Sequence, residues 1–171
     1  MPLTTPSTER YDEFCALVTE FDGASLEGSG FFGDNQPVLT EEGYRAWVST
    51  LTEEADPSTP PLPGRVKCSY FWITDDDGAW VGFLALRRSL NDYLREQGGH
   101  IGYSVRPTRR REGHAGAALR EALVEAAALG LDRVLITCDD DNVASARTIE
   151  SCGGVQEDTR HGKRRYWVAT P

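Results

Sequence analysis

The sequence lacks any apolar run near the ~20 residues that crossing a bilayer requires. Its first eight residues are polar, without the basic region or hydrophobic core of a secretory signal. Its four cysteines form no CxxC pair and its three histidines form no HExxH motif, so neither a disulfide framework nor a metal site is indicated. We therefore expect a cytoplasmic protein that needs no metal and no membrane.

Basic residues are scarce at the start of the chain. Residues 1–60 hold 12 acidic and 2 basic side chains, for a net charge of -10, whereas residues 61–171 hold 15 acidic and 16 basic, for +1. This argues against nucleic acid as a partner, because phosphate backbones require basic surface. The acidic third could favour a cationic acceptor, or it could simply be a solvated face that keeps the chain soluble.

The length of 171 residues predicts one domain, residues 1–171, with two regions of different character. Helical spacing of apolar residues predicts a helix over 9–21 and another that begins after Thr40 and ends before Pro57. A glycine-rich loop around Phe31 and Phe32 joins them. The proline-rich segment 57–64 reads as a stiff connector. We treat residues 1–65 as a helical region that comes before a strand-rich core.

Residues 66–171 alternate between strand and helix signals. We expect two helices, one from near Gly113 and one over 142–152, and strands at 66–74, 79–86, 100–105 and 133–139 with a final hairpin over 155–169. This order predicts a mixed α/β fold with one strand–helix–strand crossover in the middle.

The stretch RPTRRREGHA places four arginines within six positions, immediately before the helix that starts near Gly113. The first amides of a helix have no partner inside it, and the helix dipole adds partial positive charge, so such an end binds phosphate. The arginines could add charge-assisted hydrogen bonds. Alternatively, Gly113 only ends a loop and the arginines are solvated. Neither a Walker loop nor a GxGxxG fingerprint is present.

Arg110-x-x-Gly113-x-Ala115 resembles the acetyl-coenzyme A signature (Arg/Gln)-x-x-Gly-x-(Gly/Ala) of the GNAT N-acetyltransferase superfamily. The context strengthens the resemblance: a strand before it, an alanine-rich helix after it, and Asn142 opening a later helix that ends at Gly153-Gly154. The match covers about residues 66–168. It implies a mostly antiparallel central sheet of six to seven strands with flanking helices and a splayed fourth strand, here 100–105. The helical residues 1–65 would then form the acceptor side.

The resemblance also implies where acetyl-CoA, the cosubstrate, would bind. Backbone groups of Ser104 and Val105 would contact the pantetheine arm, and Asn142 and Ser145 would lie near the thiol. The pyrophosphate would rest, with Arg110 nearby, on the backbone amides of Arg111, Glu112, Gly113, His114, Ala115 and Gly116. Alternatively, Asn142 only caps its helix and Ser145 is an exposed helical residue.

For catalysis, the resemblance points to His100 as a base, because many relatives carry a glutamate there, and to the Val105 amide as the oxyanion partner. His100 could instead be a packing or surface residue. The tyrosine that relatives often use to protonate the thiolate is replaced by Ile149, so Ser145, Tyr166 or solvent would have to act. Tyr166 could equally pack in the last strand. A covalent route through Cys138 is the least favoured.

We therefore expect an N-acetyltransferase that moves an acetyl group from acetyl-CoA to a primary amine of a small molecule or peptide by direct attack. The alternative is an acyl-CoA-binding sensor with little turnover, which the replacement at Ile149 motivates. An interaction domain without cofactor would require the arginine cluster to be incidental. Phe31-Phe32 and residues 87–97 could form the acceptor wall or be ordinary loops. A homodimer is compatible, since dimers are common among relatives.

Overall fold

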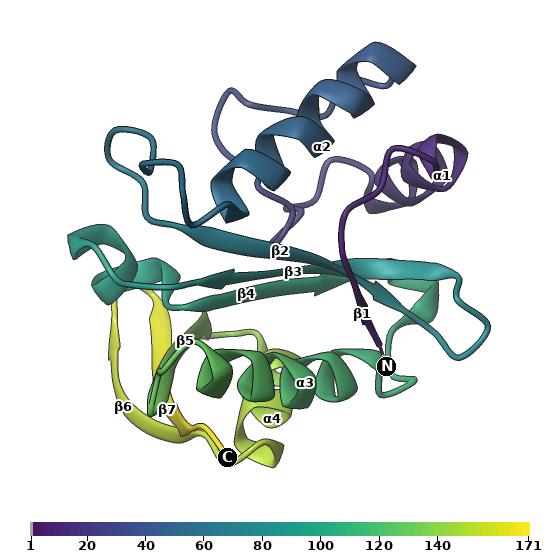
Figure 1. Ribbon diagram of the computed structural model, residues 1–171. Coiled ribbons are helices and arrows are strands. Elements are labelled where there is room, and N and C mark those ends of the chain that lie inside the picture. Colours follow the sequence, from purple (N-terminus) through teal and green to yellow (C-terminus); the bar gives the residue numbers. More distant parts are fainter. Residues whose placement is uncertain (1) are drawn as a thin grey trace.

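The computed structural model describes residues 2–171, so Met1 lies outside it. A seven-stranded sheet runs through the domain in the order β1-β2-β3-β4-β5-β7-β6 (Figure 1). Neighbouring strands are antiparallel except for β4 and β5, which are parallel. The strands are β1 Leu3–Thr4, β2 Cys68–Thr74, β3 Trp80–Arg87, β4 Ile101–Val105, β5 Arg133–Asp139, β6 Val155–Arg160 and β7 Lys163–Ala169.

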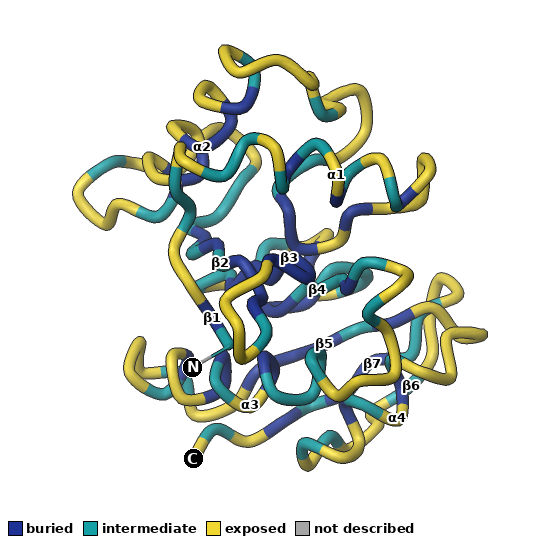
Figure 2. The backbone as a smooth tube through the Cα atoms, turned by 90° about the vertical axis from the view of Figure 1, so that its right-hand side faces the viewer, coloured by how far each residue is buried: buried dark blue, intermediate teal, exposed yellow. Residues whose placement is uncertain are grey.

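Two layers of helix cover the sheet, one on each face (Figures 1 and 2). Helices α1 (Tyr11–Phe21) and α2 (Glu41–Ala55) lie on one face. Helices α3 (His114–Ala128) and α4 (Val143–Ser151) lie on the other. Two short elements flank β4: a π-helix, η1 (Leu94–Gly98), and a 3-10 turn, η2 (Pro107–Arg109).

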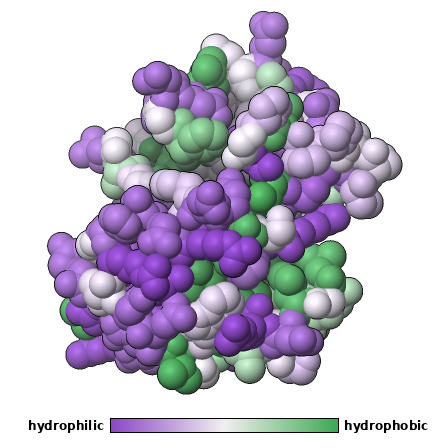
Figure 3. Space-filling view, turned by 90° about the vertical axis from the view of Figure 1, so that its left-hand side faces the viewer, coloured by the Kyte–Doolittle hydropathy of each residue, from purple (hydrophilic) through white to green (hydrophobic). Residues whose placement is uncertain are grey.

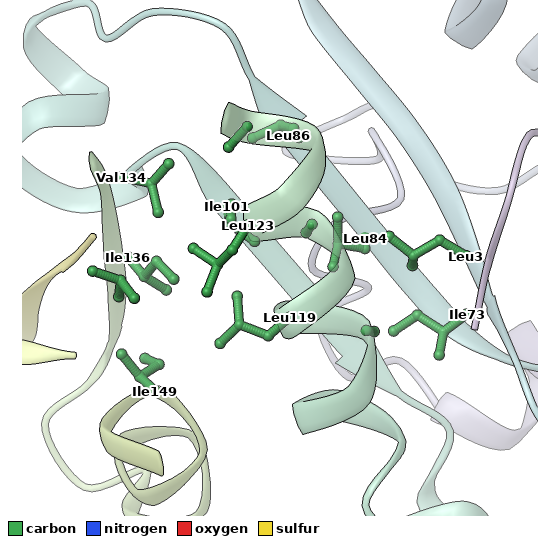
Figure 4. Close-up of a cluster of buried hydrophobic side chains, with 14 of the residues drawn as sticks. Leu3, Ile73, Leu84, Leu86, Ile101, Leu119, Leu123, Val134, Ile136 and Ile149 are labelled. Carbon is green, nitrogen blue, oxygen red and sulfur yellow. The ribbon is translucent and has the colours of Figure 1, made fainter. Parts of the chain in front are cut away.

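Each face of the sheet has its own hydrophobic core, because successive side chains of a strand point to opposite faces. On the α3/α4 side, leucines of α3 pack against β3, β4 and β5, with Ile149 of α4 beside Ile136 (Figure 4). On the α1/α2 side the core is aromatic. Trp72 and Trp80 stack there with ring centroids 3.9 Å apart, and Phe14 and Trp47 of the same cluster stack at 5.0 Å.

The edge strand β6 is exposed along nearly its whole length. The face of the molecule that carries this edge is predominantly hydrophilic (Figure 3). Arg160, at the end of β6, pairs with Glu96 of η1 and with Asp158 of its own strand. Charged side chains of this kind discourage edge-to-edge pairing with another sheet.

The fold confirms the predicted mixed α/β architecture and the order of its main elements. The Thr40 side chain caps α2 as predicted, accepting from the Gly43 amide at 3.0 Å. Three details differ. The first helix begins at Tyr11 rather than residue 9, the two-residue strand β1 was not predicted, and η1 forms in a segment expected to be irregular. β1 is too short to carry a periodic signal, and it forms only because β2 offers an edge.

The parallel pair β4–β5 is the one irregular place in the sheet. Its register contains a single residue pair, Ile101 with Ile136, whereas β3 and β4 are paired over five residues. Beyond Ile101 the two strands therefore diverge. This is the splayed fourth strand that the sequence resemblance implied.

Gly82, in the middle of β3, lies against the backbone of β4. A Cβ atom at this position would be 2.1 Å from the carbonyl oxygen of Ser104. We predict that Gly82→Ala lowers the free energy of unfolding by at least about 2 kcal/mol, because two paired strands must separate to admit the methyl group. Urea denaturation measures this change. Gly102→Ala on β4 is the matched control, since its new Cβ would meet nothing closer than 3.6 Å. An equal loss in both variants would contradict the explanation.

Candidate active site

A cleft of about 550 Å³ opens where β4 and β5 diverge. The divergence itself provides its floor, with Tyr103 on β4 and Cys138 on β5. Loop residues 25–33 and the segment from Arg87 to Gly98 form its walls, so both segments predicted as acceptor walls line one cleft. Asn142, Ser145 and Lys163 complete the lining on the β5 side.

The open edge of β4 exposes backbone groups. In an antiparallel pair, consecutive residues alternate between pointing their N–H and C=O toward the partner strand and away from it. The Arg106 amide donates to Val81 of β3 at 2.8 Å, so the amides of Val105 and Tyr103 point the other way, toward β5. The ladder to β5 has ended by then, which leaves these amides free for a ligand.

Ser104 lies differently from the prediction. The same alternation directs its backbone groups toward Phe83 of β3, inside the ladder. Its hydroxyl donates to the Glu27 carbonyl at 2.7 Å and ties loop 25–33 to β4. Tyr103 and Val105, rather than Ser104 and Val105, therefore present backbone groups to the space between the strands.

The turn after β4 carries a run of free amides. Among residues 2–171, no group accepts a hydrogen bond from the backbone N–H of any residue from Arg111 to Gly116. Arg111 (φ 68°) and Gly113 (φ 90°) both have left-handed backbone, a pattern that gathers consecutive N–H groups into an anion-binding concavity. No side chain caps α3, whereas Thr40 and Asn142 cap α2 and α4. This turn fits a phosphate group.

Most of the arginines around the turn are used inside the protein. Arg109 pairs with Asp75 and with Glu112, both at 2.9 Å, and Glu112 also contacts His114 at 3.0 Å. The Arg110 Nε donates to the Val105 carbonyl at 2.9 Å. Arg111 is exposed and has no side-chain partner among residues 2–171, so it alone of these three arginines is free to meet an anion.

Arg106 fixes the turn to the helix layer on the other face of the sheet. Its Nε donates at 2.6 Å to Glu20 of α1, and the Thr108 amide and hydroxyl also donate to Glu20, each at 2.6 Å. Burial by itself would raise the pKa of Glu20, but the hydrogen bonds from Thr108 and Arg106 outweigh it and lower the pKa to about 2. Glu20 therefore stays ionised and anchors the turn.

Asn142 and Ser145 lie together at the start of α4 and line the cleft. The Asn142 Oδ1 accepts from the Ser145 amide at 3.1 Å, so Asn142 caps the helix. This contact uses only its carbonyl oxygen. Within residues 2–171 the Asn142 amide nitrogen makes no hydrogen bond, and the Ser145 hydroxyl lies beside the hydroxyl of Tyr103.

Tyr103 is a site residue that sequence analysis missed. Its hydroxyl is buried and has no hydrogen-bond partner in the described part of the chain, although the hydroxyls of Ser145 and Thr148 lie beside it. Burial raises the pKa of Tyr103 to about 12, so the hydroxyl keeps its proton at neutral pH. A buried donor without an acceptor in hydrogen-bond geometry is suited to a ligand acceptor placed next to it.

His100 does not line the cleft, and its ring is committed to the sheet. The Leu135 amide donates to His100 Nδ1 at 2.9 Å, and the His100 amide donates to the Leu135 carbonyl at 2.7 Å. Burial, with the positive charges of Arg87 and Arg95, lowers the pKa of His100 to about 4. The neutral ring therefore carries its proton on Nε2 and has no free lone pair. The geometry does not support His100 as the base. It clamps β4 to β5 instead.

Two other residues predicted to act in catalysis, Tyr166 and Cys138, are also buried, whereas Ser145 belongs to the cleft lining. Tyr166 is fully buried and donates to Glu150 at 3.0 Å, away from the cleft lining. Ile149 is buried in the α3/α4 core, where a tyrosine could not reach the cleft without displacing packed side chains (Figure 4). Cys138 does line the cleft, but burial raises the pKa of its thiol, which disfavours the reactive thiolate.

All four cysteines are free thiols. Within residues 2–171, no group of three or more His, Cys, Asp or Glu side chains is arranged to hold a metal ion. No helix in this range combines the length and apolar character needed to cross a membrane.

A family model described as an acetyltransferase (GNAT) domain matches residues 5–155, most of the chain. The chain belongs to the GNAT acetyltransferase family. The predicted membership is thereby confirmed, and the chain is an acyltransferase. No curated protein sequence matches it.

Solved structures share the acetyltransferase fold at low sequence identity. RimJ from Mycobacterium smegmatis, in complex with CoA-disulfide, is 20% identical with a TM-score of 0.71, over 98% of this chain and 80% of that one. The microcin C7 self-immunity acetyltransferase MccE, with acetyl-CoA and AMP, is 16% identical with a TM-score of 0.69, over 98% and 91%. A spermidine N-acetyltransferase SpeG chimera from Vibrio cholerae and hSSAT is 14% identical with a TM-score of 0.64, over 98% and 94%.

The hydrogen bonds of Glu20 should make the free energy of unfolding of this acetyltransferase depend on pH. Because the folded-state pKa is depressed, its contribution to stability is present above about pH 4.5 and is lost as the pH falls toward 2. We predict that Glu20→Gln lowers the free energy of unfolding by about 3 kcal/mol at pH 7, and by progressively less between pH 4.5 and 2. Urea denaturation across this pH range measures the difference. Glu125→Gln on the exposed side of α3 is the control; a constant difference for Glu20→Gln at every pH would contradict the pKa argument.

Proposed function

We propose that this acetyltransferase moves an acetyl group from acetyl-CoA to a primary amine of a small molecule or peptide by direct attack. The single observation that carries the proposal is the run of six free amides, residues 111–116, at the uncapped start of α3. It lies directly after the open edge of β4, so an anion-binding turn and a row of free strand amides adjoin each other. A ligand with a diphosphate and an amide-bearing arm matches both.

The residues present fit the coenzyme. The amides of 111–116 would hold its diphosphate, with the exposed Arg111 adding a charge-assisted contact. The free backbone amide of Tyr103 is available to its amide-bearing arm. At the other side of the opening, Asn142 and Ser145 line the cleft and would lie near the thiol of the coenzyme. When bound, acetyl-CoA supplies a thioester that is activated toward amines.

Two groups on β4 are suited to stabilising charge during transfer. The Val105 amide, which points into the opening, would donate to the oxygen that becomes negative when an amine attacks the acetyl carbonyl. The Tyr103 hydroxyl would donate toward the departing sulfur. Its high pKa makes it a hydrogen-bond donor rather than a strong acid, which suffices because a thiolate is already a good leaving group. Tyr103 thus offers the hydroxyl that Ile149 lacks, which weakens the sensor alternative.

Coenzyme binding is tested at Gly113. We predict that Gly113→Asp weakens CoA binding by about 10²-fold, because a carboxylate would enter the concavity meant for phosphate. Isothermal titration calorimetry with CoA measures the affinity without requiring turnover. Gly130→Asp, at the opposite end of α3, is the matched control: both glycines have positive φ and open space around the missing Cβ. Equal affinity in Gly113→Asp and wild type would rule out this turn as the phosphate site.

The proposed role of Tyr103 predicts two measurable effects of removing its hydroxyl, one on kcat and one on the melting temperature. Tyr103→Phe should lower kcat by about tenfold, because the departing sulfur loses a hydrogen bond. The same variant should melt at a temperature no lower than wild type, because it removes a buried hydroxyl that has no partner. Thiol-release kinetics and thermal melting measure the two effects. A large loss of stability would instead show that the hydroxyl is a structural group, and unchanged kcat would remove it from the reaction.

A further inference from the structure

Loop 25–33 lines the cleft, but nearly all acidic residues of the first third lie outside the lining. Of the 12 acidic residues in 1–60, only Glu27 lines the cleft. The other carboxylate in the lining, Asp139, is paired with Lys163. The overall charge of the chain therefore gives no guide to the acceptor, and the suggestion of a cationic acceptor loses its basis. The charges that remain unpaired inside the cleft are the better guide.

Arg87, at the end of β3, carries one of the unpaired charges of the cleft. Its Nη1 donates to the carbonyls of Gly98 and Gly99, both at 3.2 Å, and these contacts hold the guanidinium in the cleft wall. No carboxylate pairs with it among residues 2–171, and its Nη2 and Nε have no partner in that range. The guanidinium lies beside Gly102 of β4, where an added Cβ would be 3.7 Å from Nη2. Gly102 directly precedes Tyr103 at the opening.

The other cations of the cleft are neutralised. Arg65 pairs with the buried Glu54 at 3.1 Å, and Tyr70 donates to the same carboxylate at 2.6 Å. The Arg65 guanidinium also lies over the Phe32 ring, 4.7 Å from its centroid. Lys163 is held by Asp139. Arg87 is therefore the lining cation without an ionic partner in the described chain.

Glu27 is the matching anion. It is exposed, forms no ion pair within residues 2–171, and accepts only from the neighbouring Ser25 hydroxyl at 2.8 Å. Its backbone carbonyl accepts a hydrogen bond from the Ser104 hydroxyl of β4 at 2.7 Å. The cleft thus presents one unpaired carboxylate and one unpaired guanidinium. An acceptor that carries both an amine and a carboxylate would complement both.

Resting on the proposed function, we infer that the acceptor is a small amine that bears a carboxylate: an amino acid or a short peptide with a free C-terminus. The planar fork of Arg87 would bind the carboxylate through Nη2 and Nε, a geometry that a guanidinium matches and an ammonium does not. Glu27 would attract the amine end. A polyamine would instead leave Arg87 facing positive charge.

Matched acceptor pairs test the inference on the wild-type protein. CoA-thiol release is measured with glycine and glycinamide, with dialanine and dialanine amide, and with spermidine. We expect kcat/KM to be about 10²-fold higher for each acid than for its amide, and lowest for spermidine. The amides have the less basic amines and so a larger reactive fraction, which works against the expected result.

Substitutions at Arg87 provide a second test of the inference. Arg87→Gln should bring the acid-to-amide ratio to within about threefold of one, and Arg87→Lys should give an intermediate ratio. Arg45→Gln, an exposed arginine of α2 outside the cleft lining, is the matched control and should keep the wild-type ratio. Melting temperatures and CoA calorimetry establish that each variant is folded. If Arg87→Gln does not fold, the acid-to-amide ratios of Arg87→Lys and of the wild-type protein still test whether Arg87 binds the carboxylate.

The outcomes separate this inference from the function on which it rests. Turnover with equal use of acids and amides, a preference for spermidine, or an acid preference that survives in Arg87→Gln would each overturn the carboxylate assignment while leaving the acetyltransferase intact. Absence of CoA binding in calorimetry, together with absence of thiol release for every amine, would instead overturn the proposed function and the inference with it.

Discussion

The site depends on one feature of the sheet: β4 and β5 run parallel but share a single residue pair, Ile101 with Ile136. His100 and Leu135, bonded to each other through backbone and ring, hold the strands together at that end. From there the strands separate, and backbone groups that a regular sheet would satisfy internally remain free. The cleft, the free amides of β4 and the position of the Tyr103 hydroxyl all follow from this divergence.

The arginine-rich turn serves structure more than its composition suggests. Glu20, Asp75 and the Val105 carbonyl each bind an arginine of the turn, and these contacts hold its backbone in one shape. A preorganised concavity binds an anion without first paying to order a loop. The positive charge of Arg106, Arg109 and Arg110 thus helps to hold the backbone of the turn in place, and its amides have no partner within residues 2–171.

Sequence patterns predicted the fold well because apolar periodicity reports which face of an element is buried. They also predicted the position of the uncapped start of α3, since glycine and free helix amides are local properties. They failed where tertiary pairing decides. The register of β4 with β3 decides whether Ser104 or Tyr103 turns its backbone groups toward the cleft. The His100 ring accepts a hydrogen bond from the amide of Leu135, which lies 35 residues away in the sequence. The net charge of residues 1–60 likewise says nothing about which side chains reach the cleft.

The two hydrophobic cores support different parts of the molecule. Aromatic packing supports the face that carries loop 25–33, whereas aliphatic packing supports α3 and the turn before it. Residues such as Phe31 and Phe32 can therefore be exchanged during evolution with little disturbance to the opposite face. Descendants of one ancestor could change loop 25–33 while keeping α3 and the turn before it unchanged, and the contact between Glu20 and Arg106 is one place where a change on one side must be answered on the other.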